Sequence, residues 1–219
     1  MDLKIKNLTI KAKNEEKPIL EVENFHLKSG ENLVVSGESG AGKTTFLNLI
    51  SLIEIPASGE IWWDKRKISS LNEAKKDEFR SQNFGIVMQN FHLIKNLSAI
   101  ENILLLNLFL TNKRVSKEFA LSLLKEVGVN NPNLKLKFYS RGQMQRIAII
   151  RALATNPKVL ILDEPTASLD TKNSKMIINL LTNFTNTTNT TMIIATHDEN
   201  IKNSFKNILD IKKGVPIKW

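Results

Sequence analysis

The stretch from Leu33 to Phe46, LVVSGESGAGKTTF, constrains this chain of 219 residues more than any other. Three apolar residues predict a buried parallel strand, and a glycine-rich loop then leads into a helix that opens near Lys43. Glycines let the backbone fold so tightly that successive N–H groups point into one concavity, where they and the helix dipole hold phosphate oxygens. The stretch therefore predicts a strand, a phosphate-binding loop and a helix.

The residue types of this loop indicate a nucleoside triphosphate as ligand. Lys43 would reach the β- and γ-phosphates, and the Thr44 hydroxyl would bind Mg²⁺. A glycine-rich turn that only caps a helix is the alternative, but no such turn needs the Lys-Thr pair. The residues expected to contact nucleotide here are Gly37, Glu38, Ser39, Gly40, Ala41, Gly42, Lys43, Thr44 and Thr45.

Composition places the chain among ordinary globular proteins. Hydrophobic residues make up 42% and charged residues 24%, so disorder is excluded as the general state. The net charge of +9 suggests a nucleic acid or an anionic membrane as partner. However, the excess comes from lysines scattered along the chain without a run of like charges, and we expect no specific binding of nucleic acid.

The compartment is constrained by what the sequence lacks. Without cysteine, neither a disulfide framework nor a thiolate metal site can form. The N-terminus alternates charged and apolar residues instead of carrying the apolar core of a signal peptide. The longest apolar run, from Ile103 to Leu110, is far shorter than the roughly 20 residues that span a bilayer. We therefore expect a soluble, cytoplasmic chain.

The first half of the chain predicts strands on both sides of the loop. Alternating hydrophobicity indicates strands at residues 3–10 and 19–27, with a turn at 13–17. After the loop, the helix should end before Pro56, Ser58 and Gly59 should form a turn, and residues 60–63 a strand whose two tryptophans pack in the core. A polar helix is expected at 70–80 and a buried strand at 84–88. This strand ends at Gln89, where a polar side chain is well placed to face a ligand.

Helix start signals dominate the middle of the chain. Ser98 opens a capping box before an apolar run, and Ser140 with Gln143 opens another before a helix that continues through Ala154. A further helix is expected at residues 116–128. Residues from about 90 to 140 are therefore mostly helical, which is typical of a subdomain inserted into an α/β core.

Two acidic residues follow the last fully apolar strand, at 159–162. That strand, a helix at 171–184 and a strand at 190–195 continue an alternation that predicts a mostly parallel sheet. Asp163 stands where an acid can hold Mg²⁺ opposite Lys43, and Glu164 is the natural general base for an attacking water. A polar exit from the strand without a catalytic role is the alternative, which the phosphate loop disfavours.

In this order the motifs resemble those of the nucleotide-binding subunits of ABC transporters, over nearly the whole chain. Gln89 is similar to the Q-loop glutamine of that family, and His197, after the last strand, is similar to its switch histidine. Ser140-Arg-Gly-Gln143 resembles its LSGGQ signature, and Ser168-Leu-Asp170 its D-loop. Leu160 to Glu164 resembles its second nucleotide motif, with Glu164 as the catalytic glutamate.

The resemblance implies one α/β domain over residues 1–219 with ATP and Mg²⁺ as cofactors. Its fold would be a P-loop NTPase core with a mostly parallel sheet, an N-terminal antiparallel β region and the inserted α-helical subdomain, which carries the signature at its end. Beside the loop residues, Ser140, Gly142, Gln143 and Asp170 would contact nucleotide, Thr44, Gln89 and Asp163 would hold the metal, and Glu164, His197 and Gln89 would act in catalysis.

The resemblance also implies partners. Two subunits, either identical or a pair of related ATPases, would associate head to tail, because the signature of one completes the ATP site on the phosphate loop of the other. An integral membrane permease on a separate chain would hold the dimer peripherally at the inner face of the cell membrane. Residues 84–102 are most similar to the lipoprotein-releasing, macrolide-exporter and cell-division branch.

Three departures from the family pattern stand out. Arg141 replaces the first signature glycine, and a glycine that needs positive φ would not tolerate arginine cheaply. Tyr139 replaces the leucine before the signature serine. Near Ala12, relatives usually carry an aromatic residue that stacks on adenine.

Other functions stay open at this stage. A cell-division ATPase that signals across the membrane without moving a solute fits the same residues. A self-contained P-loop kinase for a small molecule is disfavoured by the Ser140 signature and Gln89. A DNA-handling ATPase is suggested only by the charge of +9.

Overall fold

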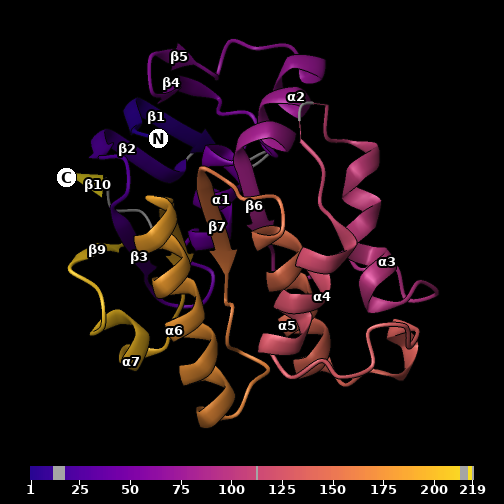
Figure 1. Ribbon diagram of the computed structural model, residues 1–219. Coiled ribbons are helices and arrows are strands. Elements are labelled where there is room, and N and C mark those ends of the chain that lie inside the picture. The colour runs from indigo at the N-terminus through magenta and orange to yellow at the C-terminus, as the bar shows by residue number, and fades with distance from the viewer. Residues whose placement is uncertain (12–17, 112, 213–216, 219) are drawn as a thin grey trace.

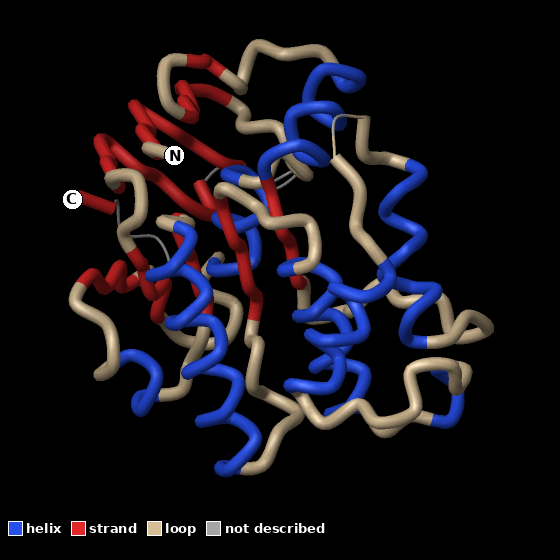
Figure 2. The backbone as a smooth tube through the Cα atoms, viewed as in Figure 1, coloured by secondary structure: helices blue, strands red, loops and turns tan. Residues whose placement is uncertain are grey.

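The strands of the chain form two five-stranded sheets in the computed structural model, which describes residues 1–11, 18–111, 113–212 and 217–218 (Figure 1). The expected turn at 13–17 and Ala12 lie outside the described residues. Figure 2 shows the strands gathered on one side of the molecule, with most of the helices below and beside them. None of the helices in the described ranges is long and apolar enough to cross a membrane.

The core sheet has the order β6-β7-β8-β3-β9, and every pair of neighbouring strands is parallel. Its strands are β3 (Asn32–Ser36), β6 (Phe84–Val87), β7 (Val159–Asp163), β8 (Thr191–Ala195) and β9 (Asn207–Asp210). Parallel strands end at the same edge of a sheet, so the phosphate loop after β3 and the acidic pair at the end of β7 lie at one edge. The predicted parallel sheet is confirmed.

The second sheet has the order β10-β2-β1-β4-β5. It consists of β1 (Leu3–Lys11), β2 (Pro18–Leu27), β4 (Ser58–Trp63), β5 (Arg66–Lys67) and β10 (Ile217–Lys218). Strand β1 pairs antiparallel with both β2 and β4, which confirms the N-terminal antiparallel region. The short β10 is parallel to β2.

The prediction of a turn at Ser58 and Gly59 is wrong, because both residues belong to β4. The pairing of β4 with β1 shifts between Lys6 and Thr9, which is a bulge in the ladder. At this bulge Gly59 has φ +99°, and a Cβ there would lie 2.4 Å from the carbonyl oxygen of Asn7. The glycine therefore serves a close backbone approach inside the sheet.

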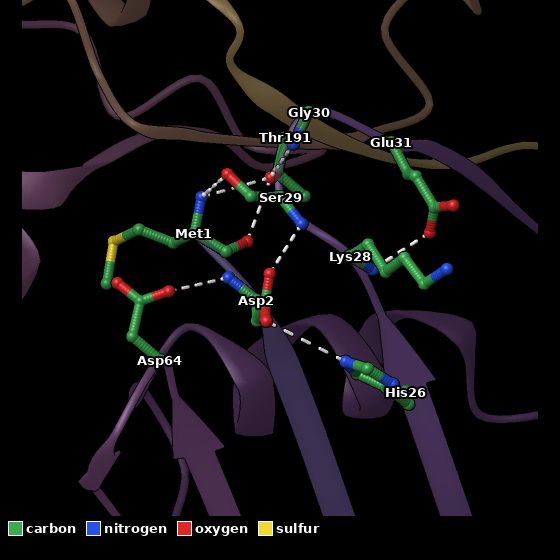
Figure 3. Close-up of polar contacts among 9 residues, drawn as sticks. All are labelled: Met1, Asp2, His26, Lys28, Ser29, Gly30, Glu31, Asp64 and Thr191. Carbon is green, nitrogen blue, oxygen red and sulfur yellow. Dashed lines mark hydrogen bonds and ion pairs between the residues drawn. The ribbon is translucent and has the colours of Figure 1, made fainter.

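Short polar contacts join the start of β1 to the core sheet (Figure 3). The Thr191 hydroxyl, at the first residue of β8, accepts a hydrogen bond from Gly30 N–H at 2.9 Å and donates one to the Met1 carbonyl at 2.9 Å. The Asp2 carboxylate accepts from Ser29 N–H at 2.7 Å. These bonds fix the antiparallel sheet against the sheet that carries the phosphate loop.

Two apolar clusters lie on opposite faces of the core sheet. One fills the space between the sheets and contains Trp63, which is fully buried and donates its indole N–H to the Ile50 carbonyl at 2.9 Å, as expected for a packing residue. The other joins the opposite face to the helices. Alternate β7 residues divide between them, with Ile161 in the first and Leu162 in the second. Each such side chain contributes roughly 1.5–3 kcal/mol on burial.

The helices begin close to the expected residues. They are α1 (Lys43–Ile50), α2 (Glu73–Asn83), α3 (Ala99–Leu104), α4 (Lys117–Glu126), α5 (Arg141–Leu153), α6 (Thr171–Thr188) and α7 (Glu199–Lys202), with 3₁₀ turns at Leu105–Leu108 (η1) and Leu136–Phe138 (η2). Both capping boxes form. Helix α2 starts later than predicted, because Asn72 caps it by accepting from Lys75 N–H.

The apolar run after Ser98 is α-helical only to Leu104. From there it continues as η1, and the Asn107 side chain bonds the backbone N–H and C=O of Val115 at 2.8 and 2.9 Å. An asparagine that binds backbone outside its own helix competes with helix continuation. The segment from Gln89 to Ser140 thus consists of short helices and loops.

Candidate active site

The loop between β3 and α1 folds as its glycines require. Gly37, Gly40 and Gly42 all have positive φ, and Gly42 is the residue that precedes the first turn of α1. A Cβ on Gly37 would lie 2.3 Å from the Ile211 carbonyl oxygen, so no side chain fits there. The loop curves against the end of β9 and presents the N-terminus of α1 to its concave side, as anion-binding loops do.

Lys43 lies across the mouth of this loop. Its ammonium donates to the Gly37 carbonyl at 2.8 Å and to the Glu38 carbonyl at 3.0 Å, and the side chain is largely buried. The same lysine lines a cavity of about 230 Å³ together with Ser39, Gly40, Gly42, Thr44, Thr45, Gln89, Asp163 and Glu164. A fixed positive charge therefore faces the space that the loop encloses.

Two of the predicted metal-binding residues are in direct contact. Thr44 Oγ1 donates to Asp163 Oδ2 at 2.8 Å, across the gap between α1 and the end of β7. Asp163 is 3% exposed, and burial raises the pKa of its carboxyl, while the Thr44 hydrogen bond acts in the opposite direction. Gln89 lines the same cavity and adds an amide.

These groups fit Mg²⁺. The ion prefers oxygen ligands and usually takes only one or two carboxylates, with phosphates and water completing the octahedron. Within the described residues no cluster of three or more His, Cys, Asp or Glu could hold a metal by itself. A site with a hydroxyl, one carboxylate and an amide matches a metal that arrives with a nucleotide.

Glu164 is held at every polar atom. Its backbone has φ +51°, its N–H donates to the Ala195 carbonyl at 2.9 Å, and its carbonyl accepts from Gln145 Nε2 at 2.9 Å. Carboxylate Oε1 lies 2.7 Å from His197 Nδ1, and Oε2 accepts from the Thr196 hydroxyl at 3.3 Å. The unusual backbone conformation and these bonds fix the position of the carboxylate, and Glu164 lines the cavity beside Thr44.

The signature residues lie apart from this cavity, at the N-terminus of α5. Ser140 is exposed, and its hydroxyl and the Gln143 side chain cap the helix reciprocally at 3.2 and 2.9 Å. Asp170 caps α6 by accepting from Asn173 N–H at 2.8 Å, which lowers the pKa of its carboxyl. One chain thus brings together the loop, Gln89, Asp163, Glu164 and His197, and leaves its signature facing outward.

Sequence reasoning missed Thr196 and Gln145 as parts of the site. Gln145 is 1% exposed and lies on the same face of α5 as the buried Ala148, Ile149 and Ala152. A polar residue at a buried helical position needs a hydrogen-bond partner, which is a signal that could have found it. Its partner, the Glu164 backbone, follows only from the tertiary fold.

The comparison with family models decides the family. Residues 20–167 match the model of the ABC transporter family. The chain belongs to the ABC transporter ATP-binding family. A relative from Methanocaldococcus jannaschii, the uncharacterized ABC transporter ATP-binding protein MJ1508, is 36% identical over 94% of this chain and 92% of its own length. The lipoprotein-releasing system ATP-binding protein LolD of Treponema denticola is 37% identical over 88% of this chain and 86% of its own.

Solved structures agree with this ABC assignment. The ATP-binding cassette MJ0796, in a dimeric post-hydrolysis state bound to ADP and Pi, superimposes with a TM-score of 0.91. It is 34% identical and covers 99% of this chain and 97% of its own. The predicted fold class is therefore confirmed over the whole cassette.

Arg141, one of the departures from the ABC pattern, carries no backbone strain. It is the first residue of α5 and is not among the described residues with positive φ, so the expected cost of replacing a glycine does not arise. The second signature glycine is the constrained one, since a Cβ on Gly142 would lie 2.9 Å from the Ser168 carbonyl oxygen. Tyr139 donates its hydroxyl to the Asn131 carbonyl, and burial raises its pKa.

Proposed function

We propose that this ABC cassette binds Mg-ATP at the cavity between the loop and β7, hydrolyses it as a dimer and drives a separate membrane permease. The observation that carries the proposal is that Lys43, the Thr44–Asp163 pair and Glu164 line one small cavity, with His197 bonded to the Glu164 carboxylate. Each group matches one need of phosphoryl transfer: charge neutralisation, metal ligation and water activation.

In the proposed reaction, Glu164 accepts a proton from water while the water oxygen attacks the γ-phosphorus. The bond between that phosphorus and the oxygen bridging to the β-phosphate breaks, and the products are ADP and inorganic phosphate. Mg²⁺ held by Thr44, Asp163 and Gln89 would neutralise phosphate charge. Lys43 and the loop N–H groups stabilise the charge that develops on the phosphate oxygens.

His197 orients the base. Because its Nδ1 lies 2.7 Å from Glu164 Oε1, it fixes the carboxylate while its own side chain stays 72% exposed. The exposed ring stands beside a second cavity of about 620 Å³, which Gly37 to Ala41 also line. A group docking into that cavity would contact His197 and the phosphate loop together.

Dimer formation accounts for the exposed signature. The N-terminus of α5 has unpaired N–H groups at its first turn and small residues at Ser140 and Gly142, which suits a phosphate of another subunit's nucleotide. The dimeric state of MJ0796 supports the pairing of two subunits, which we propose to be head to tail. Whether two identical chains or two related ATPases pair is tested by sizing the purified chain with ATP.

A groove next to α2 suits a membrane partner. It has a volume of about 460 Å³ and is lined by Phe84 and Ile86 of β6, by Leu106 and Phe109 in and just after η1, and by residues of α2 and α5. Phe109 is 64% exposed, and Leu108 beside it 77%. Exposed apolar side chains around a groove mark a protein interface. We assign this groove to the permease, which would place the cassette at the inner face of the cell membrane.

Export of the lipoprotein-release type is the branch we propose, because several relatives are named LolD. A regulatory ATPase of the cell-division type is the second candidate, favoured by the same residues 84–102. Isolation of the membrane protein that co-purifies with the chain distinguishes them. A permease with a periplasmic lipoprotein-binding domain supports the first, and a partner that moves no solute supports the second.

Phosphate release by the purified chain tests the catalytic part of the proposal. We expect ATP turnover that requires Mg²⁺ and disappears with a chelator. Substitution of Asp163 by Asn should raise the Mg²⁺ concentration needed for half-maximal rate. A wild-type chain that releases no phosphate from Mg-ATP, alone or with its permease, would contradict the proposed function.

A further inference from the structure

Helix α5 is fastened to the loop that leads from β7 to α6, here called the D-loop segment (165–170). Three side chains from its first turns reach that segment or its ends. Arg141 Nε donates to Ser168 Oγ at 2.8 Å, and Gln145 Oε1 accepts from Ser168 N–H at 3.1 Å. Arg146 donates to Asn173 Oδ1 at 3.1 Å, just past the segment.

Gln145 forms hydrogen bonds near both ends of this turn. Its amide oxygen holds Ser168 N–H, while its amide nitrogen donates to the Glu164 carbonyl at 2.9 Å. Both ends of the turn that follows the catalytic glutamate are thus bound by one buried side chain. The same side chain thus contacts both Ser168 and the backbone of Glu164, whose φ is positive and depends on its surroundings.

Arg141 adds a contact to a third element. Its guanidinium lies 5.6 Å from the centre of the Phe91 ring, two residues after Gln89. The carbonyls of Phe91 and His92 in turn accept from Arg151 at 2.7 Å each. Arg141 is thus in contact with the segment after Gln89 on one side and with the D-loop segment on the other. A glycine at this position could make neither contact.

We propose that Arg141 is a positioning residue, which holds the D-loop segment against the N-terminus of α5 through Ser168 and thereby keeps Glu164 in its catalytic orientation. The inference rests on the proposed hydrolytic role of Glu164. The guanidinium suits this position because it donates to Ser168 through Nε and keeps a flat face for Phe91.

Steady-state ATP hydrolysis by four variants tests the proposal. They are Arg141→Gln, Ser168→Ala, the double variant and, as a matched control, Arg114→Gln, which changes an exposed arginine far from α5 in the sequence. We expect each single variant of the Arg141–Ser168 pair to lower kcat about three- to tenfold, the range for one ordinary hydrogen bond, because solvent screens the charge in this exposed site. KM for ATP should stay within about twofold, because the phosphate loop is untouched.

The double variant decides whether the two residues act together. If Arg141 acts through Ser168, the kcat of the double variant should equal that of the less active single variant. A kcat equal to the product of the two single effects would contradict the proposal. So would a Ser168→Ala variant with wild-type kcat beside an impaired Arg141→Gln variant, because Arg141 would then act on something other than Ser168. Arg141→Lys, which keeps the charge without the planar fork, should recover only part of the loss.

Hydrogen exchange gives a readout that needs no catalysis. In Arg141→Gln, amides of residues 166–170 should exchange at least about threefold faster than in the wild type and in Arg114→Gln, because an opened loop exchanges faster. Unchanged exchange would overturn the inference even if the chain hydrolyses ATP. If the wild type does not hydrolyse ATP, but the amides of residues 166–170 still exchange faster in Arg141→Gln, the result counts against the proposed function and not against this inference.

Discussion

Glu164 Oε1 and His197 Nδ1 lie 2.7 Å apart, at the carboxyl ends of two adjacent parallel strands. The pairing of β7 with β8 places the two residues at one edge although 33 positions separate them in sequence. Oε2 of the same carboxylate accepts from the Thr196 hydroxyl. Thr196 also accepts from Asp198 N–H at 3.1 Å, so one buried hydroxyl ties the base to the backbone that carries the histidine.

Replacement of Thr196 by Val should therefore lower kcat while leaving KM for ATP nearly unchanged. Val keeps the shape but removes a hydrogen bond of about 0.5–1.5 kcal/mol, which corresponds to a loss of roughly two- to twelvefold. Thr196→Ser retains the hydroxyl and is the matched control. Equal rates for the Val and Ser variants would show that the hydroxyl does not orient Glu164.

Replacement of Lys43 by Ala should abolish most ATP turnover. The ammonium is the one protein cation that lines the cavity beside Asp163 in the described part of the chain, and loss of a donor to a developing phosphate charge costs about 100- to 1,000-fold in rate. Lys117→Ala, an exposed change at the start of α4, serves as control. Undiminished turnover in Lys43→Ala would refute the phosphate-binding role of the loop.

Much of this structure could be predicted from short stretches of neighbouring residues. The apolar run before Asp163, the glycines of the loop and the capping boxes at Ser98 and Ser140 each depend on neighbours within a few residues, and the structure has them as expected. Short stretches of sequence do not show which strands pair with one another. The short β9 is a strand because it pairs with β3, and its four residues have no pattern that would separate them from a loop.

The candidate site divides in the same way. The residue types of Lys43, Thr44, Asp163 and Glu164 follow from motifs, but the Gln145 contacts to Glu164 and Ser168 need α5 to pack beside the end of β7. Gly142 could be recognised as a signature residue. The need for glycine there, however, comes from the close approach of the Ser168 carbonyl, which is a tertiary contact. Side chains that position a catalytic group through the backbone therefore escape motif analysis.

Nucleotide selectivity should be weak. Of the two aromatic candidates before the loop, Phe25 and His26, Phe25 is 3% exposed and packs edge-on against Phe46 at 6.0 Å, so it is occupied in the core. Ala12, which lies outside the described residues, cannot stack on a base. Stacking of one base contributes about 1–3 kcal/mol. We therefore expect ATP and GTP affinities to differ by less than about tenfold.

Affinities for ATP, GTP and inorganic triphosphate in the wild type and in Ala12→Tyr check this expectation. The tyrosine should tighten ATP binding and leave triphosphate binding unchanged, since only the base can stack. A strong ATP preference in the wild type, with no gain in Ala12→Tyr, would mean that another residue covers the adenine.

Glu164→Gln in the presence of Mg-ATP tests the account most directly. Gln has the shape of Glu but cannot accept the proton of the attacking water, so the variant should bind ATP and hydrolyse it at least about 100-fold more slowly. ATP trapped between two subunits should then stabilise the dimer. Size-exclusion chromatography with light scattering should show a dimer for Glu164→Gln with ATP and a monomer without it. Wild-type turnover by this variant, or a monomer at saturating ATP, would contradict the account.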